Sequence, residues 1–187
     1  MTELKTNEDV LKSSDFLQAV VGLIRQMMDT ENRINPFLAV DMPDMSVVGG
    51  ANEPGVLITQ FPGEMLNSGE SKDKLAVMLK EMLKARPSDQ VAFVTEAWGT
   101  VGELPAEYWK MYQEGVLNIA DFPNKYKQEI GMIKFTDLRN SGRKEYMGRI
   151  VFQRDDNGTI MSVDDPIFLL QDTSGGVSFK GRFDDLI

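Results

Sequence analysis

Apolar residues recur at three- and four-residue spacing in two stretches of the chain, which is the pattern of an amphipathic helix. In the first stretch they are Phe16, Leu17, Val20, Val21, Ile24, Met27 and Met28. In the second stretch they are Leu75, Met78, Leu79, Met82 and Leu83. Serine hydroxyls that are suitable helix caps precede both stretches. We therefore predict helices over residues 14–31 and 71–84.

Shorter runs of β-branched and apolar residues, bounded by Gly and Pro, predict strands. They lie at residues 36–40, 56–61, 90–98 and 130–135. Val91 to Val94 is continuously apolar, which is typical of a central strand covered on both faces. The elements together predict an α+β fold with two main helices and a short helical insertion.

The clearest local pattern is Asn157-Gly158, the dipeptide most typical of a two-residue hairpin turn. We predict a strand over residues 143–154, a type I′ turn and a return strand over residues 159–163. This turn fixes two cross-strand pairs, Phe152 with Val163 and Arg154 with Met161. A calcium-binding loop over residues 153–164 is disfavoured, because position one is Gln153 and the flanks alternate like strands.

An aromatic segment interrupts the strands, and we predict that it forms a helical insertion over residues 104–123. Its rings belong to Tyr108, Trp109, Tyr112 and Phe122. We expect the chain to form a single domain over residues 13–171, which contains this insertion. A flexible lead over residues 1–12 precedes the domain, and a C-terminal arm over residues 172–187 follows it.

The inventory of side chains restricts the chemistry of the protein. None of the 187 residues is cysteine or histidine, which excludes thiolate nucleophiles, Ser-His-Asp catalysis and zinc sites built from Cys or His. Carboxylate, lysine, tyrosine and hydroxyl chemistry is left. We expect no cofactor and no metal site.

Charge is unevenly distributed along this acidic chain. The formal net charge is −9, yet residues 124–154 carry eight basic and three acidic side chains. No stretch approaches the roughly 20 apolar residues of a membrane span, and the N-terminus lacks the apolar core of a secretory signal. We expect a cytoplasmic protein with no membrane contact.

Two short motifs carry a resemblance. The strand from Val91 to Trp98 ends in Glu-Ala-Trp, and Arg143-Lys144-Glu145 opens the later hairpin strand. In this order the elements resemble a group of small uncharacterised bacterial and phage proteins, over residues 14–98 and 143–163. The resemblance implies a compact α+β domain with the two main helices packed on a mostly antiparallel sheet. The protein would be located in the host cytoplasm, or in the virion if phage-encoded, and the resemblance implies no activity. In this chain 44 residues separate Trp98 from Arg143, where the group has a shorter link, so the aromatic segment is interpreted as an elaboration.

The same motifs supply a candidate site. If the two strands are neighbours, Glu96, Trp98, Arg143 and Glu145 form a cluster. In it Arg143 or Lys144 pairs with Glu96, and Trp98 stacks beside the guanidinium. We interpret this cluster as structural, an ion pair that fixes strand register. The alternative is a carboxylate-dependent enzyme in which Glu96 acts as an acid or a base.

The sequence as a whole favours a non-enzymatic interaction or accessory protein that binds a protein partner or a second copy. We expect partner contacts from the aromatic insertion, residues 104–123, and from the C-terminal segment, residues 172–187. Tyr and Trp concentrate binding energy at interfaces, so the expected contact residues are Tyr108, Trp109, Tyr112 and Phe122. A further alternative is a nucleic-acid contact through residues 124–154, against which the acidic net charge argues.

Overall fold

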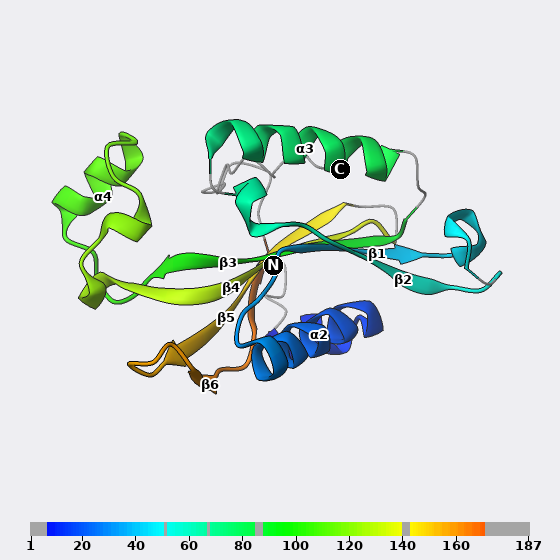
Figure 1. The fold of residues 1–187 in the computed structure, drawn as a ribbon, viewed down its shortest axis with the longest axis horizontal. Helices are drawn as coiled ribbons and strands as arrows, with labels where there is room; N and C mark the ends of the chain where they lie inside the picture. Colours follow the sequence, from blue (N-terminus) through cyan, green and yellow to red (C-terminus); the bar gives the residue numbers. More distant parts are fainter. Residues whose placement is uncertain (1–6, 51, 67, 85–87, 140–142, 171–187) are drawn as a thin grey trace, which may run out of the picture.

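Antiparallel strands form one curled sheet with helices on both faces (Figure 1). This is seen in a computed structural model, which describes residues 7–50, 52–66, 68–84, 88–139 and 143–170. The described strands are β1 Phe37–Met42, β2 Gly55–Gln60, β3 Gln90–Thr100, β4 Lys127–Asp137, β5 Lys144–Arg154, β6 Ile160–Val163 and β7 Ile167–Leu170. Their order is β2-β1-β3-β4-β5-β6, and β7 also pairs with β5. The predicted α+β class is confirmed.

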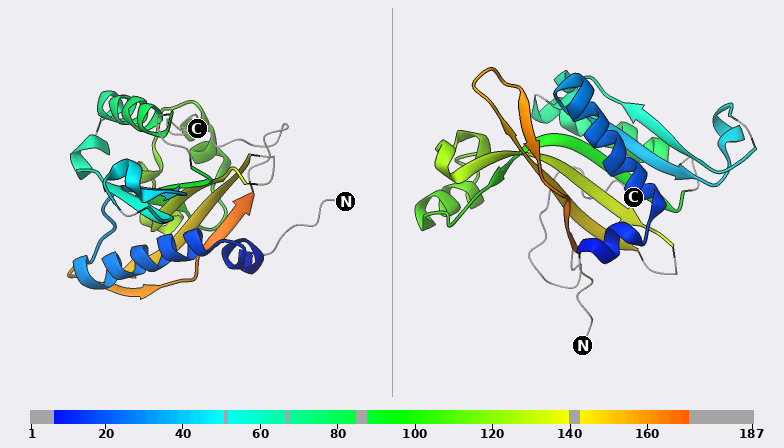
Figure 2. Two further views of the ribbon diagram at one scale, coloured as in Figure 1. Left: turned by 90° about the vertical axis from the view of Figure 1, so that its right-hand side faces the viewer. Right: turned by 90° about the horizontal axis from the view of Figure 1, so that it is seen from below.

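The described α-helices are α1 Asn7–Lys12, α2 Asp15–Glu31, α3 Gly69–Lys84 and α4 Ala106–Gln113. Four 3-10 turns complete the described elements, η1 Met45–Val48, η2 Gly63–Leu66, η3 Ile119–Asp121 and η4 Asn124–Tyr126. Ser14 caps α2 as expected, because its Oγ accepts from the backbone N–H of Leu17 at 3.0 Å. Figure 2 shows α2 and α3 on opposite sides of the sheet.

The alternation of side chains along the central strands builds one core on each face. Phe37, Ala92 and Val94 face α2, whereas Leu38 and Phe93 face α3. Both faces of β3 are therefore buried from Val91 to Val94, as its continuous apolar run predicts.

The start of the chain differs from the sequence prediction. Residues 7–12, expected within a flexible lead, form helix α1. Its Val10 is buried against the α2 core, and this contact holds a short polar helix in place. The predicted C-terminal arm, residues 172–187, lies outside the described residues.

The hairpin is real, but its turn is not type I′. A type I′ turn requires a positive φ at both central residues. Gly158 has φ of 81°, but Asn157 does not have a positive φ. The N–H of Gly158 donates to the carbonyl of Asp155 at 3.0 Å, which gives a three-residue loop closed by glycine. Phe152 does pair with Val163, but the register shifts after Gln153, so that Arg154 pairs with Ile160 instead of Met161.

β3 and β4 run on beyond the rest of the sheet. The pairing of β1 with β3 ends at Val94, and that of β5 with β4 ends at Ile130. Residues 98–129, here called the arm, therefore project as a two-stranded ribbon (Figure 1). Its end, residues 101–126, is here called the tip and contains α4, η3 and η4.

Candidate functional site

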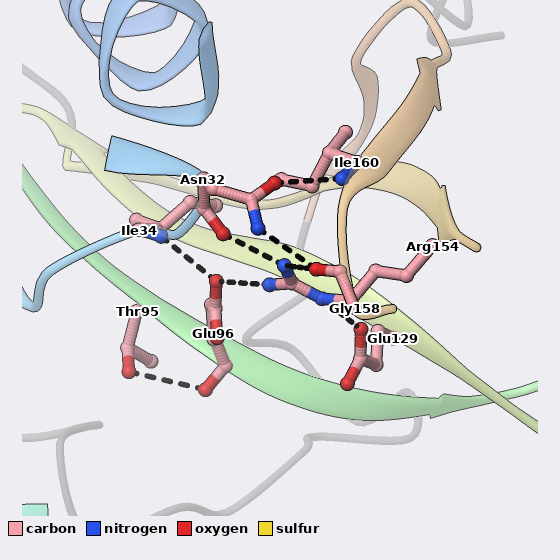
Figure 3. Close-up of polar contacts among 8 residues, drawn as sticks. All are labelled: Asn32, Ile34, Thr95, Glu96, Glu129, Arg154, Gly158 and Ile160. Atoms are coloured by element: carbon pink, nitrogen blue, oxygen red, sulfur yellow. Dashed lines mark hydrogen bonds and ion pairs between the residues drawn. The ribbon is translucent and has the colours of Figure 1, made fainter. Parts of the chain in front are cut away.

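Arg154 lies at the centre of a polar network at the base of the arm (Figure 3). Its Nη2 donates to Oε1 of Glu96 at 3.1 Å, and its Nε donates to Oε2 of Glu129 at 2.7 Å. Its Nη1 donates to the carbonyls of Asn32 at 2.7 Å and Gly158 at 3.0 Å. One guanidinium thus joins β3, β4, the end of α2 and the hairpin loop.

Asn32 completes the network from the end of α2. It has left-handed backbone geometry, with φ of 57°, and so turns the chain out of the helix. Its side-chain Nδ2 donates to the Gly158 carbonyl at 2.8 Å, and its Oδ1 accepts from the N–H of Ile160 at 2.6 Å. Asn32 therefore fastens the hairpin to the helix.

The position of Glu96 favours a structural role for its carboxylate. Its Oε1 already accepts from the backbone N–H of Ile34 at 2.8 Å as well as from Arg154. Among the described residues, no group of three or more acidic side chains is arranged to hold a metal ion. The contacts of Glu96 are those of an anchor for the base of the arm.

The predicted cluster of four residues is not brought together. β4 lies between β3 and β5, so the two motif strands are not neighbours. Glu96 is opposite Gly131, whereas Glu145 is opposite Thr136, near the other end of β4. Arg143 Nε donates to Glu145 Oε1 at 2.6 Å, within its own strand region. The cation that pairs with Glu96 is Arg154, and sequence spacing gave no signal for it.

Trp98 lies on the same face of the ribbon as Glu96, two residues further into the arm. Its side chain is 39% exposed, and the Nζ of Lys127 lies 4.8 Å from the ring centroid. Trp98 is therefore an exposed aromatic residue of the arm and not part of the predicted structural cluster.

The tip has a core of its own, built on Phe122, which is only 2% exposed. The rings of Tyr108 and Tyr112 approach Phe122 with centroid distances of 5.7 Å and 6.3 Å. Tyr126 packs in turn on Tyr108 at 5.6 Å. Phe122, expected among the contact residues, is therefore core, and the two half-buried tyrosines support it.

Trp109 is the solvent-facing ring of the tip. It is 42% exposed and contacts Tyr112 with a centroid distance of 5.7 Å. Val116, three residues beyond the end of α4, is 61% exposed. The tip thus presents an indole and an aliphatic side chain on a folded support.

The basic segment does not form one continuous patch. Arg139, Arg143 and Arg154 are engaged with carboxylates, and Lys134 is buried. The side chains of β4 and β5 also alternate between the two faces of the sheet. This distribution weakens the nucleic-acid alternative.

A second arginine cluster lies at the far end of β4. Arg139 donates to both carboxylate oxygens of Asp137, at 3.0 Å and 2.9 Å. Burial raises the pKa of Asp137, but hydrogen bonds and charge from Arg139 outweigh it and hold this pKa below its usual value. Burial and the nearby charge of Asp89 raise the pKa of Asp41.

An open hollow lies on the outer side of α3. Its lining includes Glu70, Asp73, Lys74, Val77 and Met78. Lys74 pairs with Glu70 along the helix at 2.6 Å. The hollow is a surface feature, with none of the enclosure typical of a small-molecule site.

No family model, no curated protein and no solved structure matches this chain. The resemblance based on Glu-Ala-Trp and Arg-x-Glu therefore stays a hypothesis. None of the helices in the described part of the chain is long and apolar enough to cross a membrane.

Proposed function

We propose that this chain is a non-enzymatic interaction or accessory protein that binds a protein partner through the tip of the arm. The observation that carries the proposal is the contrast inside the tip, where Phe122 is 2% exposed and Trp109 is 42% exposed. A folded support with an outward indole is the arrangement expected of an interface anchor.

Preorganisation strengthens this interpretation. Lys127 ties the ribbon back to the carbonyl of Ala120, and Asn118 and Asp121 form a capping box at η3. The tip is therefore ordered before a partner arrives, and less conformational entropy is lost on binding. The expected partner surface contains an apolar pocket for Trp109.

The test places a photo-crosslinking amino acid at Trp109 in the cell that makes the protein. The matched control places the same amino acid at Val77, which is 64% exposed on α3. The proposal predicts a discrete cross-linked protein from position 109 that is absent from position 77. Equal cross-linking from both positions, or none from position 109, would contradict it.

Once the partner is known, measuring its affinity for variants of the chain provides a second test. Trp109→Ala should weaken the complex by about 2 kcal/mol, which is roughly thirtyfold in Kd. Val77→Ala should leave Kd unchanged. If Trp109→Ala unfolds the tip instead, its far-UV circular dichroism will lose the helical signal of α4 before any partner is added.

A further inference from the structure

The two edges of the sheet are built differently. At one edge, β6 and β7 have four residues each and are separated by Asp164-Asp165-Pro166. The register also shifts between Gln153 and Arg154 where β6 pairs with β5. Short strands, acidic residues, proline and a bulge all discourage a further strand from pairing.

The opposite edge lacks these protections. β2 has the sequence GVLITQ, with no charged residue and no proline across its six residues. Within the described residues β2 pairs only with β1, so alternate backbone N–H and C=O groups point outward. In a chain that is 26% charged, such an edge is open to strand addition.

We propose that β2 pairs antiparallel with β2 of a second copy of this chain, which forms a two-fold dimer with a continuous sheet. A two-fold axis perpendicular to the sheet places each residue opposite a residue on the same face, so one residue must lie opposite itself. With Ile58 at the axis, Val56 lies opposite Gln60 of the second copy and Leu57 opposite Thr59 of the second copy.

Ile58 is suited to the position on the axis. It is opposite Ala39 in β1, on the α2 face, and is 37% exposed where β2 borders solvent. Pairing would bury this side chain against its copy, and apolar β-branched pairs stabilise antiparallel strands.

The absence of charged residues from β2 favours association of two acidic copies at this edge. Two copies that each carry −9 repel one another, so association is favoured where no charged side chain must approach another. The strand itself meets that condition, and the flanking acids Glu53 and Glu64 lie outside Pro54 and Pro62. Added salt should therefore strengthen the dimer, because it screens the repulsion between copies.

Sedimentation equilibrium of the full chain tests the proposal. Wild type should show a reversible dimer whose fraction rises with concentration. Ile58→Lys should raise the dimer Kd by about tenfold or more, because two like charges replace an apolar pair on the axis. Met161→Lys makes the same charge change on β6, where Met161 is 69% exposed, and should leave Kd unchanged. Mixing Ile58→Lys with Ile58→Glu should restore the dimer.

A covalent test does not depend on how the lysine variant folds. Because the chain has no cysteine, Ile58→Cys introduces a single thiol at the axis. Residues directly opposite in antiparallel strands have Cβ atoms about 4.5 to 5.5 Å apart, so a short bifunctional thiol reagent should link the two thiols of a dimer. Met161→Cys should not cross-link efficiently.

Three results would overturn the proposal. They are a wild-type chain that stays monomeric at every concentration and salt, equal loss of dimer in Ile58→Lys and Met161→Lys, and cross-linking that favours Met161→Cys. A dimer lost in Trp109→Ala but kept in Ile58→Lys would instead show that two copies associate through the tip. Because the arm does not include β2, failure of this proposal leaves the proposed function of the tip intact.

Discussion

In the body of the protein, here the described residues outside residues 98–129, the rings of Phe37, Phe93 and Phe135 are 0 to 2% exposed. In the tip, several rings share one small core, in which Phe122 is equally buried but Trp109 is left 42% exposed. The difference follows from size, because a small folded unit has too little interior to bury every large side chain. The tip is therefore where aromatic surface is left over for a partner.

The two regions can be followed separately in one sample. Both tryptophans of the chain, Trp98 and Trp109, lie in the arm. Tryptophan fluorescence therefore reports the arm, whereas far-UV circular dichroism is dominated by the helices and strands of the body.

The largest expected effect comes from the same substitution made in each region. Phe93→Ala removes a ring that is 2% exposed on the α3 face and should lower the free energy of unfolding by about 3 to 5 kcal/mol. Phe122→Ala removes an equally buried ring but should disorder only the tip. Its fluorescence transition should move to lower temperature while the circular dichroism transition stays near that of wild type.

This pair of variants tests whether the tip and the body unfold independently. If Phe122→Ala shifts both transitions as far as Phe93→Ala does, the tip and the body unfold as one cooperative unit. The description of the tip as an independent support for Trp109 would then be wrong.

The next effect concerns the hairpin, which belongs to the body. A Cβ at Gly158 meets no atom within 4 Å, but φ is 81°, so Gly158→Val should cost about 1 to 3 kcal/mol through backbone strain alone. Gly63→Val, at a glycine with similar space and no positive φ, is the matched control. An unchanged melt for Gly158→Val would contradict the described loop.

A smaller effect is expected where the arm joins the body. Glu96→Gln keeps an acceptor for the N–H of Ile34 but removes the charge beside Arg154. The side chain of Glu96 is 36% exposed, so we expect a loss of only about 0.5 to 1.5 kcal/mol. Partner cross-linking from position 109 should persist. Lost partner binding with an unchanged melt would mean that Glu96 has a functional role.

The smallest effect depends on pH. Because Arg139 holds the pKa of Asp137 below its usual value, ionised Asp137 stabilises the fold above that usual value. This contribution is lost as the pH falls through the lowered pKa. Asp137→Asn should therefore flatten the acid limb of the stability profile measured by circular dichroism. A profile parallel to that of wild type would contradict the assigned ion pair.

Local patterns in the sequence predicted the elements well and their long-range partners poorly. Helix α2, the buried run of β3 and the pairing of Phe152 with Val163 follow from periodicity and turn residues close along the chain. The network of Arg154 with Glu96, Glu129 and Asn32 joins four distant segments, and its formation depends on strand order. A shift of one residue after Gln153 was enough to change the predicted partner of Arg154.

The sequence also could not predict which aromatic residues of the tip are buried and which are exposed. Tyr108, Trp109, Tyr112 and Phe122 are all compatible with a surface or a core role by residue type. Only the packing of Phe122 beneath the two tyrosines separates the core ring from the exposed indole.

β3 passes through both regions without interruption, from Gln90 in the body to Thr100 at the arm. Its amide hydrogens should therefore exchange with solvent deuterium by two routes. Those from Val91 to Val94, paired on both sides by β1 and β4, exchange only when the body opens. That of Gly99 lies where β3 is paired only with β4, and local fraying of the ribbon is enough to expose it. Exchange rates measured along β3 should therefore show the position at which exchange by opening of the whole body changes to exchange by local fraying.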